Sequence, residues 1–124
     1  MKITAYDLDF DGAINSGAGA TYLHASVSGM TIGIGASSKN MHITDGELGK
    51  VTAGSLYVDR AGHNNQVYFN AVTNGNSDSF GNMLVYATGG TGEVSFTAGA
   101  SSFNMGLELQ AAKQVAVQVD VTTT

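Results

Sequence analysis

The chain has 124 residues, of which 17 are Gly and 12% are charged, with a net charge of -5 and neither Cys nor Pro. This length fits one domain with a continuous core. The lack of Cys excludes disulfides, cysteine zinc sites and thiol nucleophiles. A nucleic-acid role is disfavoured because the cations are scattered instead of clustered: Lys2, Lys39, Lys50, Arg60 and Lys113. No apolar run is long enough for a signal peptide or a membrane span.

Short bursts of alternating apolar residues recur along the whole chain and predict strands with one buried face, so the fold class is all-β. Clusters of Gly, Ser, Thr and Asn separate the bursts and predict turns. The predicted strands, in chain order, are residues 3–10, 22–27, 31–34, 41–43, 55–58, 66–69, 83–86, 93–96, 106–109 and 115–121. No linker divides them, and we expect a single domain over residues 1–124.

Two architectures fit this spacing: an antiparallel sandwich or barrel, and a solenoid of stacked parallel turns. A sandwich needs several tight hairpins, yet Asn74-Gly75 is the one clear hairpin signal. The sequence therefore favours a parallel β-helix (β-solenoid) of about five or six turns, at roughly 20–25 residues for each turn.

Part of the chain is similar to a known family. Thr31-Ile32-Gly33-Ile34-Gly35, followed by Ile43-Thr44-Asp45-Gly46-Glu47-Leu48 and then Val51, Gly54, Leu56 and Val58, resembles the β-solenoid repeats of filamentous-haemagglutinin-like bacterial adhesins. These are two-partner-secreted or autotransported surface proteins. The chain departs from the pattern at Asp59, where such repeats often carry Gly, so we expect a different corner there.

The resemblance implies a right-handed parallel β-helix at the cell surface or outside the cell, with a structural or adhesive role. It carries over no catalytic residues and no cofactor, and we expect no enzyme activity. A polysaccharide hydrolase needs two carboxylates set across a groove, or acids gathered with an Arg or Lys. Here Glu93, Glu108 and Asp120 are isolated in the sequence, and Arg60 is the one Arg.

A calcium site is a weak alternative at the N-terminal acids. Asp7, Asp9 and Asp11 repeat the opening of a calcium-binding loop, but the acid required at the twelfth position is replaced by Ala18. A strand with Leu8 and Phe10 inward explains the same spacing and is the favoured interpretation.

Two further motifs have structural interpretations. Thr44 and Glu47 have the spacing of a helix capping box and predict one helical turn. His24, His42 and His63 stand roughly twenty residues apart, so they would align in a coil of that period. None has a short-range ligand spacing, and we expect no metal.

Carbohydrate binding is the main alternative function. The five Tyr offer rings for an exposed row on which sugars can stack, or are packed at the edges of turns: Tyr6, Tyr22, Tyr57, Tyr68 and Tyr86. Tyr57 and Tyr68 alternate with apolar neighbours, which places both on the outer face. They are the candidate glycan contacts.

Self-assembly is the favoured mode of action. The interior is predicted to hold Ile32, Ile34, Ile43, Leu48, Val51, Leu56, Val58, Val67, Phe69, Leu84, Val94, Phe96, Leu107, Leu109, Val117 and Val119. Strand-like sequence at both ends predicts open terminal turns, which would join head to tail into a filament or a longer shaft. The predicted interface residues are Ile3, Val115, Val117, Val119 and Val121.

Overall fold

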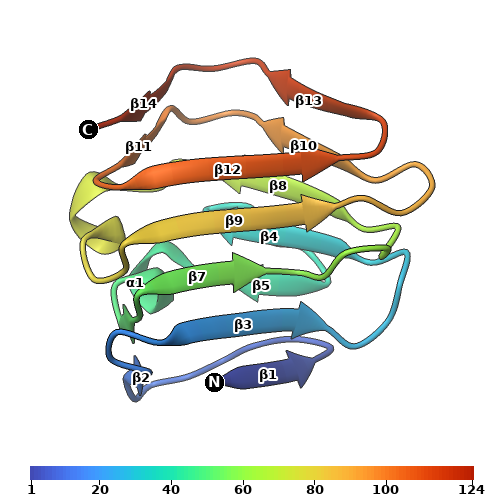
Figure 1. Ribbon diagram of the computed structural model, residues 1–124. Coiled ribbons are helices and arrows are strands. Elements are labelled where there is room, and N and C mark those ends of the chain that lie inside the picture. The colour runs from blue at the N-terminus through green and yellow to red at the C-terminus, as the bar shows by residue number, and fades with distance from the viewer.

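The computed structural model describes residues 1–124 and is all-β apart from two single helical turns (Figure 1). The strands are β1 (Lys2–Ala5), β2 (Ile14–Asn15), β3 (Ala20–Ala25), β4 (Thr31–Gly35), β5 (Met41–Ile43), β6 (Val51–Thr52), β7 (Ser55–Val58), β8 (Gln66–Asn70), β9 (Asn82–Ala87), β10 (Glu93–Phe96), β11 (Ser101–Phe103), β12 (Gly106–Ala111), β13 (Gln114–Val117) and β14 (Val121–Thr123). The helical turns are α1 (Asp45–Leu48) and the 3-10 turn η1 (Asn74–Ser77).

Two five-stranded sheets make up most of the molecule, and every strand pair in it is parallel. Sheet I has the order β1-β3-β7-β9-β12, and sheet II has the order β13-β10-β8-β4-β5. Figure 1 shows the strands of sheet I one above another, with the N-terminus at one end of the stack and the C-terminus at the other. Each pass through sheet I and then sheet II is called a rung below. The C-terminal rung consists of β12, β13 and β14.

The core lies between the sheets because like residues stack in register. In sheet II, Ile34 pairs with Phe69 and Phe69 pairs with Phe96. The rings of Phe69 and Phe96 stack with centroids 4.6 Å apart, and the Phe103 ring meets both edge-on. Such stacked apolar columns keep water out of the interior and supply most of the stabilisation that a chain without disulfides needs.

The capping box at Thr44 is confirmed. The Thr44 side chain accepts from the backbone amide of Glu47, and the Glu47 carboxylate accepts from the Thr44 amide at 2.7 Å. This reciprocal pair begins the helical turn α1 and satisfies amides that the turn would otherwise leave without partners.

Strand β5 is added to sheet II by an unusual return of the chain. After β4, residues 36–40 cross back over the outer face of β4, and β5 then pairs parallel with it. The crossing is so close that a Cβ built on Gly33 would overlap the Ser37 carbonyl oxygen. Gly33 is therefore required at this position for space.

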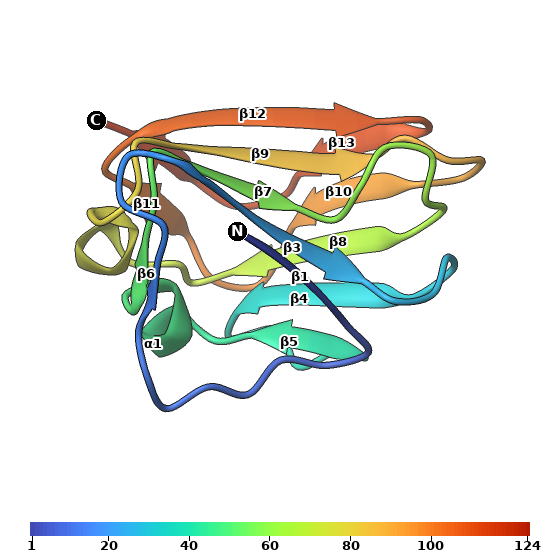
Figure 2. The same cartoon turned by 60° about the horizontal axis from the view of Figure 1, so that its bottom comes forward.

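The predicted strand 3–10 is only partly formed. β1 ends at Ala5, and residues 6–12 run across the N-terminal end of the molecule beside β5 (Figure 2). The Asp7 carboxylate accepts from the amide of His42 at 2.8 Å, and Leu8 and Phe10 pack against the core. This segment covers the free edge of β5, whereas β1 keeps an open edge.

Most predicted interior residues lie in the core, with two kinds of exception. Leu84 is buried, but it pairs with Tyr57 on the outer face, while its neighbours Met83 and Val85 point inward. The inward prediction for Leu84 was therefore wrong. The other exceptions belong to the C-terminal rung: Leu107, Leu109 and Val119 are only partly buried, and Val117 is exposed.

Candidate functional site

A row of stacked tyrosines marks the outer face of sheet I. Tyr22 pairs with Tyr57, and their rings stack with centroids 4.6 Å apart and an interplanar angle of 19°. The Tyr86 ring continues the row at 6.2 Å from Tyr57, with an interplanar angle of 10°. The parallel register places Tyr22 beside Tyr57. The register partner of Tyr57 on β9 is Leu84, and Tyr86 lies two residues further along the same outer face. Tyr22, Tyr57 and Tyr86 are called the tyrosine row below.

An open pocket of about 270 Å³ lies along the tyrosine row, and the three tyrosines form part of its lining. Its remaining lining residues are His24, Asp59, Arg60 and Ala61. His24 lies on β3 and contacts Tyr22 edge-on with ring centroids 5.9 Å apart. Asp59 follows directly after β7, so both polar groups come from the ends of neighbouring strands of sheet I.

Asp59 has an uncommon backbone conformation. Its φ angle is 58°, in the left-handed region that favours Gly, and its side chain is completely buried. This is the position at which the sequence departs from the Gly of the adhesin-like pattern. A buried carboxylate in a strained conformation persists only when its surroundings hold it there.

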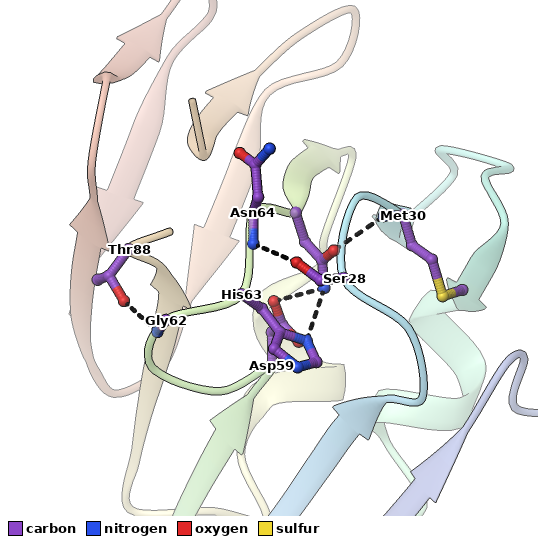
Figure 3. Close-up of polar contacts among 8 residues, drawn as sticks. Ser28, Met30, Asp59, Gly62, His63, Asn64 and Thr88 are labelled. Atoms are coloured by element: carbon purple, nitrogen blue, oxygen red, sulfur yellow. Dashed lines mark hydrogen bonds and ion pairs between the residues drawn. The ribbon is translucent and has the colours of Figure 1, made fainter. Parts of the chain in front are cut away.

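A hydrogen-bond network centred on Asn65 holds the Asp59 corner, and Figure 3 labels three other members of it, Met30, Asp59 and His63. The Asn65 side-chain amide donates to Asp59 Oδ2 at 2.7 Å and lies 3.3 Å from His63 Nδ1, while Asn65 Oδ1 accepts from the Met30 amide at 2.8 Å. With its ring proton on Nε2, His63 accepts at Nδ1 from the Asn65 amide. A protonated His63 instead forms an ion pair through Nδ1 with Asp59 Oδ1, 3.4 Å away.

Two buried polar atoms of the pocket residues have no hydrogen-bond partner in the chain, namely Asp59 Oδ1 and His24 Nδ1. Burial raises the pKa of Asp59 above its ordinary value of 3.8, and the Asn65 hydrogen bond and His63 offset part of this rise. Burial also lowers the pKa of His24, with the nearby charges of Lys2, Arg60 and His63 acting in the same direction. His24 is therefore held neutral more strongly than an exposed His.

The structure separates the two predicted glycan contacts. Tyr57 is the middle member of the tyrosine row on sheet I, whereas Tyr68 lies on β8 of sheet II. Lys39 Nζ sits over the Tyr68 ring, 4.3 Å from its centroid. Tyr22 and Tyr86 belong to the five Tyr considered for a sugar-stacking row, although only Tyr57 and Tyr68 were chosen as contacts. His24 and Asp59 were not predicted as parts of this site, and the departure from Gly at Asp59 was the available signal for that corner.

The three histidines do not line up. His24 and His63 lie near one another at the Asp59 corner. His42 lies on β5 of sheet II, and its Nε2 is 2.8 Å from the Gly35 carbonyl oxygen.

The three candidate calcium ligands lie in the segment that follows β1. The Asp7 carboxylate accepts from the amides of Leu8 and His42. Asp9 and Asp11 are exposed. No group of three or more His, Asp or Glu side chains in the chain is arranged to hold a metal ion.

The predicted interface residues gather at the two ends of the stack. β12, β13 and β14 each end their sheet with one unpaired edge. Val115 and Val117 are 42% and 60% exposed, and Val119 and Val121 are partly buried. Ile3 lies on β1 at the opposite end and is also partly buried.

Comparison of the chain with protein-family models, with curated proteins and with solved structures found no match. The structure contains no helix with the length and apolar character needed to cross a membrane.

Proposed function

We propose that the chain is a β-solenoid that serves as a non-catalytic structural or adhesive element outside a bacterial-type cell. Each sheet adds strands in a regular succession, and all of the pairs are parallel. A coil of stacked rungs produces this pattern, because each turn of the coil places its strands beside those of the turn before. The adhesin-like sequence from Thr31 to Val58 supports the extracellular role.

The observation that carries the proposal is the exposure of inward-facing residues in the C-terminal rung. Val94 and Phe96 on β10 are buried, whereas their register partners Val115 and Val117 on β13 are exposed. Three unpaired strand edges accompany these side chains. Apolar side chains beside open strand edges form a template for a further parallel rung.

A second copy of the chain, bound head to tail, fits this end. The edge of β1 is also open and belongs to the same sheet as β12, so a head-to-tail contact extends sheet I with all strands parallel. Residues 6–12 cover the edge of β5, so direct strand pairing between copies is limited to sheet I. A heterologous contact of this kind propagates into a filament.

The charges at the two ends of sheet I also support a second copy of the chain as the partner. The outward column of sheet I runs through Lys2, Tyr22, Tyr57, Leu84 and Glu108 in register. Continuing this register into a second copy places Glu108 of β12 beside Lys2 of the next β1. Opposite charges on neighbouring strands favour that pairing over a tail-to-tail contact.

Electron microscopy of the purified chain tests the proposal. The parent is expected to form rods longer than one molecule, and Val117→Lys is expected to give single particles because a charge on the docking rung opposes burial. Val27→Lys is the matched control, because Val27 is 53% exposed in the turn between β3 and β4. Single particles of the parent, or equal disruption by Val27→Lys, would contradict the proposal.

Carbohydrate binding is the second candidate function, and the tyrosine row is the observation that favours it. Three aromatic rings on consecutive strands of one face offer a surface that contacts the apolar faces of sugar rings. Glycan-array binding that is lost in Tyr57→Ala and kept in Tyr68→Ala supports this function. An array without any binding by the parent would dismiss it.

A further inference from the structure

The pocket beside the tyrosine row contains two buried polar atoms that form no hydrogen bond within the chain, and His63 Nδ1 lies 3.4 Å from one of them, Asp59 Oδ1. Asp59 is completely buried and His24 is 8% exposed, yet Asp59 Oδ1 and His24 Nδ1 form no hydrogen bond within the chain. Buried polar groups are almost always paired, and an unpaired one destabilises the fold. Both residues line the same pocket, so a bound molecule can supply the missing partners.

The chemistry of these atoms restricts that molecule. An ionised Asp59 needs a hydrogen-bond donor, which disfavours an anion. The neighbouring positive charges of Lys2 and Arg60, both of which lower the pKa of His24, disfavour a cation. A hydroxyl group both donates and accepts, so it can donate to Asp59 Oδ1 and pair with His24 Nδ1 in either tautomer.

The walls of the pocket restrict the molecule further. Tyr22, Tyr57 and Tyr86 present aromatic surface beside the two polar atoms. A sugar ring combines apolar C–H faces with hydroxyl groups at its rim, which matches this juxtaposition. The volume of about 270 Å³ lies just below the range of roughly 300–1,000 Å³ typical of pockets for drug-sized ligands, so it suits one sugar residue.

We propose that this pocket binds one neutral pyranose residue, with a sugar hydroxyl donating to Asp59 Oδ1 and the ring lying against the tyrosine row. The inference rests on the second candidate function, carbohydrate binding, and is independent of filament assembly. Asn65, whose Oδ1 accepts from the Met30 amide, positions Asp59 for this contact by donating to its other carboxylate oxygen, Oδ2.

NMR titration with methyl pyranosides of glucose, galactose, mannose and N-acetylglucosamine tests the inference. At least one of these probes is expected to shift the resonances of His24 and Tyr57 with a dissociation constant of about 1 mM, as suits a small ligand in a shallow pocket. Asp59→Asn replaces the acceptor with an amide and should weaken that binding at least fivefold. Tyr68→Ala, on the opposite sheet, should bind like the parent.

A second variant covers the case in which Asp59→Asn does not fold. Asp59→Gly suits the φ angle of 58° and should fold but lose pyranoside binding. Binding by Asp59→Asn or Asp59→Gly at parental strength, together with loss in Tyr57→Ala, would leave sugar binding to the tyrosine row and overturn the pocket assignment. Absence of shifts with every pyranoside, or shifts with tetramethylammonium alone, would overturn it as well.

Discussion

Val117 lies directly beside Phe96 in the register of sheet II, yet Phe96 is 1% exposed and Val117 is 60% exposed. Both side chains point toward the interior, but only Phe96 has a further rung stacked on it. Phe96 is covered by the C-terminal rung, whereas nothing in the chain covers Val117. The end of the stack therefore exposes apolar side chains that occupy core positions in the rung before it.

The proposed pairing of Glu108 with Lys2 of the next copy can be tested by exchanging the two charges. In a head-to-tail stack, Lys2→Glu and Glu108→Lys each place like charges on neighbouring strands, so each single variant should assemble less well than the parent. The double variant restores an opposite pair and should recover assembly. The expected effect is about 0.2–1 kcal/mol, or up to roughly fivefold in the association constant. Sedimentation velocity at low salt measures it, and failure of the double variant to recover would count against this register.

Burial of Leu56 is the basis of the second prediction. Leu56 is completely buried between Thr21 and Met83 of the neighbouring strands. Leu56→Asp places a carboxylate without a partner in this column and should cost several kcal/mol, a large part of the roughly 5–15 kcal/mol by which domains are stable. Thr52→Asp, at an exposed position on β6, is the control. A urea melt of Leu56→Asp that matches the control would mean that the inward assignment is wrong.

The return of the chain over Gly33 leads to the third prediction. Gly33→Ala forces residues 36–40 away from β4 and should destabilise the fold by about 1–3 kcal/mol, as overpacking does. Gly46→Ala is the matched control, because Gly46 lies in α1 and a Cβ there meets nothing within 4 Å. That substitution should be neutral or stabilise by up to about 1 kcal/mol. Thermal melts of equal midpoint for both variants would contradict the crossing.

The pKa of Asp59 gives a prediction about pH. Its folded-state pKa lies above the ordinary value of 3.8, so the folded chain holds a proton that the unfolded chain releases. The resulting stabilisation is present below this ordinary value and is lost as the pH rises through the folded-state pKa. Asp59→Asn does not titrate and should gain stability relative to the parent as the pH rises from about 4 to 7.

Chemical denaturation across that pH range measures the difference between the Asp59→Asn variant and the parent. Asp9→Asn serves as the control because Asp9 is exposed. A constant difference between Asp59→Asn and the parent at all pH values would show that Asp59 does not titrate as its burial implies.

The sequence predicted the fold class and most strands because alternation of apolar residues reports directly on a half-buried strand. It failed where every residue of a strand is apolar. In Met83-Leu84-Val85-Tyr86, local sequence does not say which two side chains face the core, and the register with Tyr57 decides that Leu84 faces outward. The strand prediction also failed from Asp7 to Asp11. These residues alternate in polarity, but sheet II ends at β5 and they do not join it as a further strand.

The candidate site was largely beyond prediction from the sequence. Tyr57 and Tyr68 have the same alternating pattern, and only the assignment of their strands to different sheets separates them. The pocket joins His24 and Asp59 across neighbouring strands, and each of these residues leaves a buried polar atom without a hydrogen bond. Neither relationship has a short-range sequence signal. The strained corner at Asp59 did have one, in the replacement of an expected Gly.

Cysteine cross-linking tests head-to-tail assembly most directly, because the chain has no Cys of its own. Thr4 and Gln110 are exposed and occupy one outward column at opposite ends of sheet I. In the predicted contact they become neighbours on paired strands, at a separation that suits a disulfide. Mixing Thr4→Cys with Gln110→Cys under mild oxidation should give a mixed disulfide dimer, and neither variant alone should cross-link. A Gln110→Cys homodimer, or no cross-link in the mixture, would contradict head-to-tail assembly.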